Sequence, residues 1–346
     1  MWKTAAAFAA VLTMAGAASA ETTTLKIATF VTGKHAMSQW IDKWAADLAA
    51  RSGGRLEFEI LHGAQMGPPP KYYDIASSGQ ADIVWHLHGA TPGRFELTEV
   101  SNMPFLFCSA EQATRVINDP AIRAKYLDPE HRGVKVLAVF MHPPGQIMSN
   151  SGPVTKLDDM KGKGIRPVSA AVARFIEAMG GTPVGLPPTE MAEALQKGTL
   201  QGTMIDYGGA AYAYQLGPHL TDITEVYAYA SSFVLAMNPD SFAKLPADIQ
   251  AMIDESVADV SAEIGQVWDG LDATGKAKLQ GEGVTIHQLS PEEFAKVEAL
   301  GTAVTEDYVA GLDKAGKPGS ELLAVMRQMA VEVGPVGPGC AARAGS

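Results

Sequence analysis

Residues 25–60 read LKIATFVTGKHAMSQWIDKWAADLAARSGGRLEFEI, and this stretch decides the fold class. It begins with an apolar run, Leu25–Val31, that is typical of a strand. A helix is predicted next, because apolar side chains recur at helical spacing: Met37, Trp40, Ile41, Trp44 and Leu48. Gly53 and Gly54 end this pattern. Residues 56–60 then alternate as a strand does. A strand, a helix and a strand in this order predict parallel pairing and an α/β fold.

The same alternation continues along the chain. It predicts strands at 81–87, 134–140, 164–166 and 232–237, and helices at 170–179 and 190–197. One long helix is predicted over 247–279, which at 1.5 Å per residue is about 50 Å long. That length exceeds the width of one lobe, so we expect this helix to lie across two lobes, with a bend near Gly265 or Gly270.

The first twenty residues have the features of a secretory signal peptide. Lys3 gives a positive start, residues 5–15 are apolar and uncharged, and Ala18-Ser19-Ala20 is a small-residue cleavage site. We therefore expect export to the periplasm with cleavage after Ala20. No cysteine follows this site, which excludes lipid attachment there. The sequence does not decide whether its two cysteines, Cys108 and Cys340, pair with each other.

Size and charge limit the possible functions further. About 325 residues remain after cleavage, more than one hydrophobic core usually serves, so two lobes are expected. We predict lobe I from residues 21–143 plus 232–270, lobe II from 144–231 plus 271–331, and a flexible tail from 332–346. The whole chain has 27 Lys and Arg and 38 Asp and Glu. Cleavage of the signal peptide removes Lys3, so the net charge of the mature chain is 26 − 38 = −12. Such an acidic protein is a poor partner for nucleic acid.

No enzyme motif is found in the sequence. The chain has no Gly-x-Ser-x-Gly, no His-Glu-x-x-His and no phosphate-binding glycine loop. His86 and His88 lie two residues apart on a predicted strand, and with His142 they could form a zinc site. We favour the simpler interpretation that these histidines line a cleft or pair in the core. Neither a metal nor a cofactor is expected.

Arg166 is the strongest candidate for a binding residue. It ends a predicted strand just before Pro167, and open α/β sheets bind ligands at the carboxyl ends of their strands. A guanidinium group can hold a carboxylate with two parallel hydrogen bonds. The alternative is an ordinary surface ion pair of Arg166 with Asp158 or Asp159. Spacing alone does not separate these two interpretations.

Several motifs in a fixed order resemble the solute receptors of tripartite ATP-independent periplasmic (TRAP) transporters. The most specific stretch is LDDMKGKGIRP at 157–167; the others are IASSGQADI at 75–83, GTPV at 181–184 and SFAKLP at 241–246. The resemblance covers nearly all of the mature chain. It implies a two-lobed periplasmic binding protein fold with a hinge and a long helix across both lobes. It also implies a receptor without catalytic activity that delivers a small organic carboxylate to the membrane subunits of a TRAP transporter.

The resemblance assigns the ligand carboxylate to Arg166, but the chain departs from the family pattern. Gln146 stands where a second arginine is often found, Gln201 replaces a usual acidic residue, and a downstream asparagine is replaced near Ile205-Asp206-Tyr207. With one arginine, we expect a monocarboxylate with an aromatic or a hydroxy- or keto-substituted body. The expected ligand-binding residues besides Arg166 are flat walls and hydrogen-bonding groups: Trp85, Tyr207, Phe233, His88, His142 and Gln146.

Two other functions stay open at this point. A periplasmic sensor module for a signalling receptor would use the same pocket and would differ only in its partner. A periplasmic enzyme on a similar scaffold would need a coupled acid–base pair, for which the sequence offers no motif.

Overall fold

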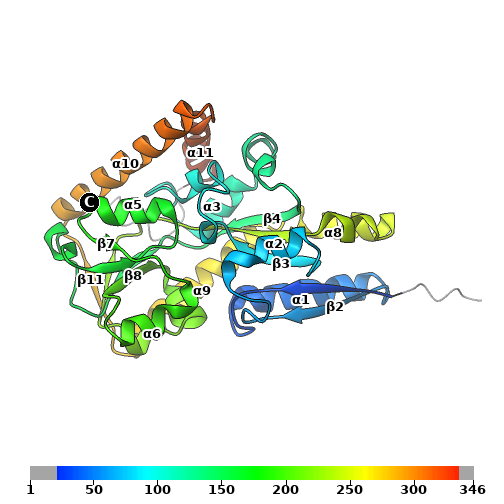
Figure 1. The fold of residues 1–346 in the computed structure, drawn as a ribbon, viewed down its shortest axis with the longest axis horizontal. Coiled ribbons are helices and arrows are strands. Elements are labelled where there is room, and N and C mark those ends of the chain that lie inside the picture. Colours follow the sequence, from blue (N-terminus) through cyan, green and yellow to red (C-terminus); the bar gives the residue numbers. More distant parts are fainter. Residues whose placement is uncertain (1–21, 335–346) are drawn as a thin grey trace, which may run out of the picture.

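The strands of the protein form two separate sheets. The computed structural model describes residues 22–334. One sheet has the strand order β2-β1-β3-β10-β4, and the other has the order β11-β9-β5-β8-β6-β7. The two sheets lie one after the other along the long axis of the molecule, with helices around them (Figure 1). The fold is therefore α/β with two lobes, as predicted. We call the lobe with the first sheet lobe I and the other lobe II.

The first sheet contains the strand–helix–strand unit predicted from residues 25–60. β1 (Thr23–Ala28) pairs in parallel with β2 (Leu56–Leu61) and β3 (Ile83–Leu87), and α1 (Ala36–Arg51) connects β1 to β2. α1 buries the apolar stripe read from the sequence, and α2 (Tyr72–Ser77) precedes β3. β4 (Lys135–Met141) and β10 (Ser232–Met237) complete the sheet in antiparallel pairs. α3 (Ala110–Ile117) packs against β4.

The second sheet is built from shorter strands. They are β5 (Gln146–Ser149), β6 (Gly164–Arg166), β7 (Thr182–Pro183), β8 (Gly202–Ile205), β9 (Asp222–Glu225) and β11 (Thr285–Gln288). The helices α5 (Ala170–Ala178) and α6 (Met191–Gln196) belong to this part of the chain. β6 of this sheet has the predicted bounds, as does β10 of the first sheet. The other strands are too short for their side-chain alternation to be recognised in the sequence.

Two chain segments connect the sheets and are bonded to each other. The first runs from Met141 to Gln146 and the second from Glu225 to Ser232. The Gly145 amide donates to the Tyr229 carbonyl at 2.6 Å. A Cβ at Gly145 would lie 2.5 Å from the Tyr229 ring, so this close crossing requires glycine. The connections therefore form one paired strip, which is the geometry of a hinge.

The helix predicted over 247–279 is two helices, so that prediction was wrong. α8 (Ala247–Val257) packs on lobe I, and α9 (Ser261–Gly281) follows after a break at 258–260. The predicted bend sites lie inside α9 instead, where Gly265 permits close packing: a Cβ there would lie 2.3 Å from the Glu111 Cα of α3.

Of these two helices, α9 is the one that connects the lobes, and it lies between the labelled elements of the two sheets in Figure 1. It contacts α1, α3 and β4 in lobe I and the turn Gly209–Ala213 in lobe II. Asp272 fixes it to lobe II, because its Oδ1 accepts hydrogen bonds from the Tyr207 and Gly208 amides at 2.7 and 3.3 Å.

Two further helices complete the described chain. α10 (Pro291–Lys314) is capped by Ser290, whose Oγ accepts from the Glu293 amide at 3.3 Å. α11 (Gly319–Val333) extends two residues into the predicted tail at 332–346. The predicted signal peptide with its cleavage site, the rest of the tail and Cys340 lie outside the described residues. Within residues 22–334, no helix combines the length and apolar character of a membrane span.

Candidate functional site

A small cavity lies where the two lobes and α9 meet. Its volume is 30 Å³. Phe30, His35, Trp85, Leu87 and Phe233 line it from lobe I, and Trp268 lines it from α9. His142 comes from the first connection between the lobes. The remaining wall belongs to lobe II and its loops: Arg166, Val168, Pro188, Ile205, Asp206, Gly209, Ala213 and Tyr214.

Arg166 is a buried cation at the end of β6. It is 4% exposed, and its Nε donates to the Leu186 carbonyl at 3.4 Å. No acidic side chain within residues 22–334 forms an ion pair with it, and burial lowers the pKa of its guanidinium. The surface ion-pair alternative is wrong, because Asp158 pairs with Lys161 and Asp159 accepts hydrogen bonds from residues 155 and 156. Arg166 thus offers a buried positive charge to whatever enters the cavity.

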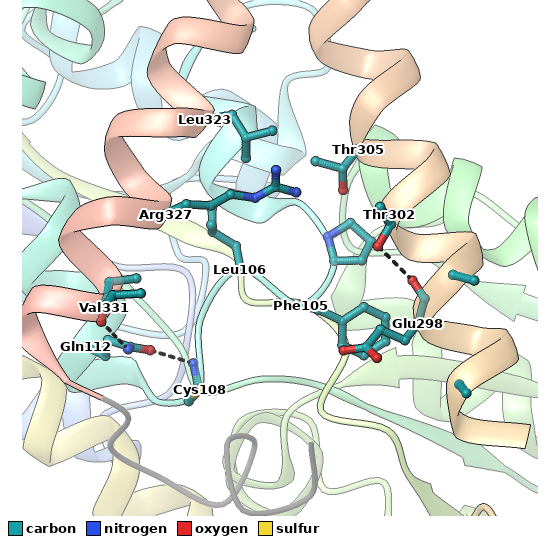
Figure 2. A pocket seen from close by; sticks show the side chains of 14 residues that line it. Phe105, Leu106, Cys108, Gln112, Glu298, Thr302, Thr305, Leu323, Arg327 and Val331 are labelled. Atoms are coloured by element: carbon teal, nitrogen blue, oxygen red, sulfur yellow. Dashed lines mark hydrogen bonds between the residues drawn. The ribbon is translucent and has the colours of Figure 1, made fainter. Parts of the chain in front are cut away.

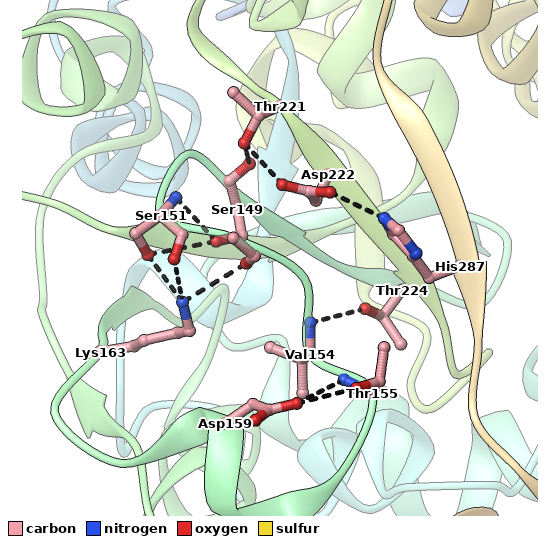
Figure 3. A network of polar contacts seen from close by, with 11 residues as sticks. Ser149, Ser151, Val154, Thr155, Asp159, Lys163, Thr221, Asp222, Thr224 and His287 are labelled. Carbon is pink, nitrogen blue, oxygen red and sulfur yellow. Dashed lines mark hydrogen bonds and ion pairs between the residues drawn. The ribbon is translucent and has the colours of Figure 1, made fainter.

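Polar contacts fix the start of β6, the strand that ends at Arg166, and Figure 3 shows those of Lys163. The Lys163 Nζ donates to the carbonyl and hydroxyl oxygens of Ser151 at 2.7 and 2.8 Å, which ties the approach to β6 to the end of β5. Gln201 accepts from the Gly164 amide at 2.9 Å through its side-chain oxygen. The glutamine that replaces the family's usual acid is therefore used to fix the strand that carries Arg166.

An outer cleft adjoins the cavity at Arg166. It measures 410 Å³ and lies between residues 89–92 of lobe I and residues 167–170 and 185–188 of lobe II. Arg166, Val168 and Pro188 line both the outer cleft and the inner cavity. The guanidinium therefore stands between the inner cavity and the outer surface.

Four aromatic rings form most of the cavity's apolar wall. The Phe233 and Trp268 rings are stacked with centroids 5.3 Å apart, and Trp85 meets Phe233 edge-on at 5.6 Å. Phe30 lies 4.9 Å from Trp85. The buried Nε1 atoms of Trp85 and Trp268 have no hydrogen-bond partner within the described chain. Two residues that line the cavity thus carry indole donors that the described chain leaves unsatisfied.

The two histidines of the cavity have different roles. Burial lowers the pKa of His35 to about 3, so its ring is neutral. The His35 Nδ1 accepts from the Met37 amide at 3.2 Å and caps α1, which leaves the ring proton on Nε2. In His142, Nδ1 donates to the Pro143 carbonyl at 2.5 Å and Nε2 accepts from the Ser231 amide at 3.2 Å. Both nitrogens of His142 are therefore hydrogen-bonded to the backbone of the hinge, and only the face of its ring can contact a ligand in the cavity.

Three of the residues expected at the site lie elsewhere. Gln146 is fully buried; its oxygen accepts from the Val226 and Tyr227 amides, and its nitrogen donates to the Pro144 carbonyl. Tyr207 lies in the core of lobe II, and its hydroxyl donates to Glu225 at 2.9 Å.

His88 is the third of these residues. It lies in lobe I with its two nitrogens on Ser232 and His131. The histidine group considered for zinc is not assembled, since His86 and His88 lie beside His131 rather than His142. Within residues 22–334, no three His, Cys, Asp or Glu side chains are placed to hold a metal ion.

Several lining residues were not expected from the sequence. Trp268 is the most important of them. A helical face through the buried Ile264 and Leu271 can include position 267 or position 268, and the structure buries Trp268 and leaves Val267 half-buried. Phe30 and His35 flank the turn after β1, and Tyr214 and Asp206 come from irregular segments. Of the aromatic residues among them, Phe30 could have been found by asking which rings follow strand ends.

Comparisons with known proteins agree with this geometry. The family of bacterial extracellular solute-binding proteins, family 7, matches residues 27–311. A marine metagenome TRAP solute-binding protein, described as specific for aromatic acid ligands and crystallised with 3-hydroxybenzoate, is 26% identical over 90% of this chain and 99% of its own, with a TM-score of 0.86. A TRAP solute-binding protein of Rhodoferax ferrireducens with copurified benzoate is 28% identical over 90% and 98% of the two chains, with a TM-score of 0.84. The C4-dicarboxylate-binding periplasmic protein of Rhodobacter capsulatus is 24% identical over 68% of both chains.

Proposed function

Since this chain belongs to family 7 of the bacterial extracellular solute-binding proteins, we propose that it captures a small aromatic monocarboxylate for the membrane subunits of a TRAP transporter. It acts in the periplasm after cleavage behind Ala20 and catalyses no reaction. The observation that carries the proposal is Arg166, a buried cation without an acidic partner within residues 22–334, placed at the rim of an aromatic cavity.

The carboxylate of the ligand supplies the charge that Arg166 lacks. An unpaired buried charge is costly, and a planar carboxylate matches the two parallel donors of a guanidinium group. Gln146, at the position of the family's second arginine, uses its whole amide on the backbone of the hinge. One carboxylate is therefore the charge that this site accommodates best.

The body of the ligand is a flat ring with an oxygen substituent. The Phe233 and Trp268 rings and the Trp85 edge provide a flat apolar wall. The indole donors of Trp85 and Trp268 favour an acceptor on that ring, such as a hydroxyl or keto oxygen. The two similar structures that hold benzoate and 3-hydroxybenzoate support this choice of ligand class.

Entry of such a ligand requires the lobes to move. The cavity measures 30 Å³, whereas an apolar cavity that admits benzene measures about 150 Å³. We propose that lobe I and lobe II rotate about the paired connections near Gly145 and Tyr229, with α11 moving with α3 of lobe I, on which it packs. Contacts from both lobes with the ligand then favour closure.

A ligand panel tests the proposal directly. Thermal unfolding of the purified protein is followed with benzoate, 3-hydroxybenzoate, cyclohexanecarboxylate and acetate. A ligand at 100 times its dissociation constant adds about 2.7 kcal/mol of stability, so the aromatic acids should raise the melting temperature measurably. Cyclohexanecarboxylate separates the need for a flat ring from the need for bulk. Stabilisation by acetate alone, or by none of the acids, would contradict the proposed ligand class.

A further inference from the structure

A second hollow lies on the surface of the protein, and none of its lining residues among 22–334 also lines the ligand cavity. It is a groove of 680 Å³ between α10, α11 and residues 104–108 (Figure 2). Pro104, Phe105 and Leu106 contribute to its apolar lining. Val331 of α11 stands at the groove and is 77% exposed, the only large hydrophobic side chain so exposed within residues 22–334. Exposed apolar surface beside a large hollow marks a place that another segment can cover.

The described chain ends beside this groove. The Gln112 Nε2 donates to the Gly334 carbonyl at 2.8 Å. The Gln112 Oε1 accepts from the Cys108 amide at 2.8 Å (Figure 2). One carboxamide therefore contacts both the last described residue and Cys108. Cys108 is itself a lining residue of the groove. The chain beyond Gly334 therefore starts close to Cys108, separated from it by the Gln112 side chain.

We propose that residues 335–346 fold back into this groove and that a Cys108–Cys340 disulfide fixes them there. Cys340 follows Gly334 by 340 − 334 = 6 residues, and six residues span at most roughly 20 Å, enough to turn back to Cys108. These are the two cysteines of the sequence. The segment reads PVGPGCAARAGS, whose prolines and glycines oppose continuation of α11 and whose apolar residues suit the lining of the groove.

Formation of the bond needs an oxidant of the exported compartment. The Cys108 and Cys340 thiols together lose two electrons and two protons, and the Sγ–Sγ bond forms. A disulfide-bearing oxidoreductase accepts both electrons and both protons and leaves as a dithiol, after a mixed disulfide with one of the two cysteines.

Thiol labelling of the purified, exported protein tests the bond. The protein is denatured and alkylated with iodoacetamide before and after reduction, and its intact mass is measured. We expect no label before reduction and two labels after it, with a Cys108–Cys340 peptide in a non-reducing digest. Two labels without reduction would overturn the proposal. A disulfide-linked dimer on a non-reducing gel would also overturn it, because the groove would then serve a second copy of the chain.

Variants separate the bond from the docking of the segment. Cys340→Ser should lower the melting temperature by about 4–10 °C, since a native disulfide contributes about 2–5 kcal/mol. Ala341→Ser is the matched control and should leave it unchanged. Both variants should keep the affinity for the ligand, because the proposal places both residues at the groove, away from the cavity between the lobes. An unchanged melting temperature in Cys340→Ser would contradict a stabilising bond.

The rate of maleimide modification of Cys108 reports on docking alone. In Cys340→Ser, residues 335–346 should still cover the groove and slow the reaction of Cys108. In a second protein that ends at Gly334, the same thiol should react at least tenfold faster. Equal rates in the two proteins would show that these residues leave the groove open, as it would be if the transporter's membrane subunits docked there.

Discussion

The Trp268 indole and the Phe233 ring lie face to face, with centroids 5.3 Å apart and planes within 13° of parallel. Trp268 belongs to α9, which bridges the lobes, and Phe233 belongs to β10, which follows the second connection between them. Both line the cavity. The stack therefore makes the bridging helix, the hinge and the wall of the ligand site one packed unit.

Replacing Trp268 with phenylalanine keeps a flat ring but removes the indole donor. We expect Trp268→Phe to weaken binding of 3-hydroxybenzoate by up to about tenfold, because a hydrogen bond contributes about 0.5–1.5 kcal/mol. Benzoate, which has no acceptor on its ring, should lose less. Calorimetry with both acids measures the difference. Trp44→Phe is the control, since the Trp44 indole donates to Ser256 outside the cavity. An equal loss for both acids would assign Trp268 a packing role only.

Removing the Arg166 guanidinium should cost most of the affinity. Breaking a buried charge pair typically costs about 3–5 kcal/mol, so Arg166→Ala should weaken binding by roughly 10²–10³-fold or more. Arg166→Lys keeps the charge without the planar fork and should lose less. Titration of the bound acid into each folded variant gives the values. Near-native affinity in Arg166→Ala would remove the carboxylate anchor from the proposed function.

The number of carboxylates on the ligand should matter as much as its ring. Benzoate should bind more tightly than isophthalate, which adds a second carboxylate to the same ring. That second charge would be buried without a cation and would pay its desolvation penalty. Competition calorimetry compares the two acids. Tighter binding of isophthalate would mean that this site accepts two carboxylates, as the name of the C4-dicarboxylate-binding relative indicates for that protein.

Acid should destabilise lobe I through its buried histidines. Burial lowers the pKa of His86 to about 3, so this ring stays neutral in the folded protein where the unfolded chain takes up a proton near pH 6.5. The free energy of unfolding is therefore unaffected by this group above pH 6.5 and decreases as the pH falls toward the folded pKa. At pH 5 the loss amounts to about 2 kcal/mol. Denaturant unfolding from pH 5 to 8 should show His86→Phe as the less pH-sensitive protein. Parallel profiles would contradict this.

Ligand binding should make the molecule more compact. The paired connections near Gly145 and Tyr229 permit rotation of the lobes, and a ligand that contacts both lobes favours the closed arrangement. Small-angle scattering should give a smaller radius of gyration with saturating benzoate. Arg166→Ala at the same benzoate concentration is the control and should keep the larger radius. A radius that does not respond in the parent protein would argue against closure.

The fold was predictable wherever the pattern was local and long. α1 and β2 have clear periods of 3.6 and 2, and β6 and β10 have breakers or polarity changes at their ends. The break between α8 and α9 was missed because apolar residues continue at helical spacing across it. Nothing local marks residues 258–260 as non-helical, so the break could not be read from the sequence pattern.

The candidate site was predictable for the residues whose direction follows from a strand. In β3, Trp85 and Leu87 face the cavity while His86 and His88 face the other side, as strand alternation requires. That rule was available in the sequence and would have separated Trp85 from His88. It says nothing about Gln146, whose amide is used by the backbone of residues 226 and 227, because this contact joins segments 80 residues apart.

The placement of Trp268 and Asp272 on α9 links ligand choice to lobe motion. The two residues are one helical turn apart on the same buried face; Trp268 lines the cavity, and Asp272 holds the amides of residues 207 and 208 in lobe II. A rigid helix moves both together. An enlarged or reshaped wall at position 268 would therefore also shift the balance between open and closed lobes. Specificity and closure in this protein cannot be engineered independently, and a redesigned receptor would have to be selected for both at once.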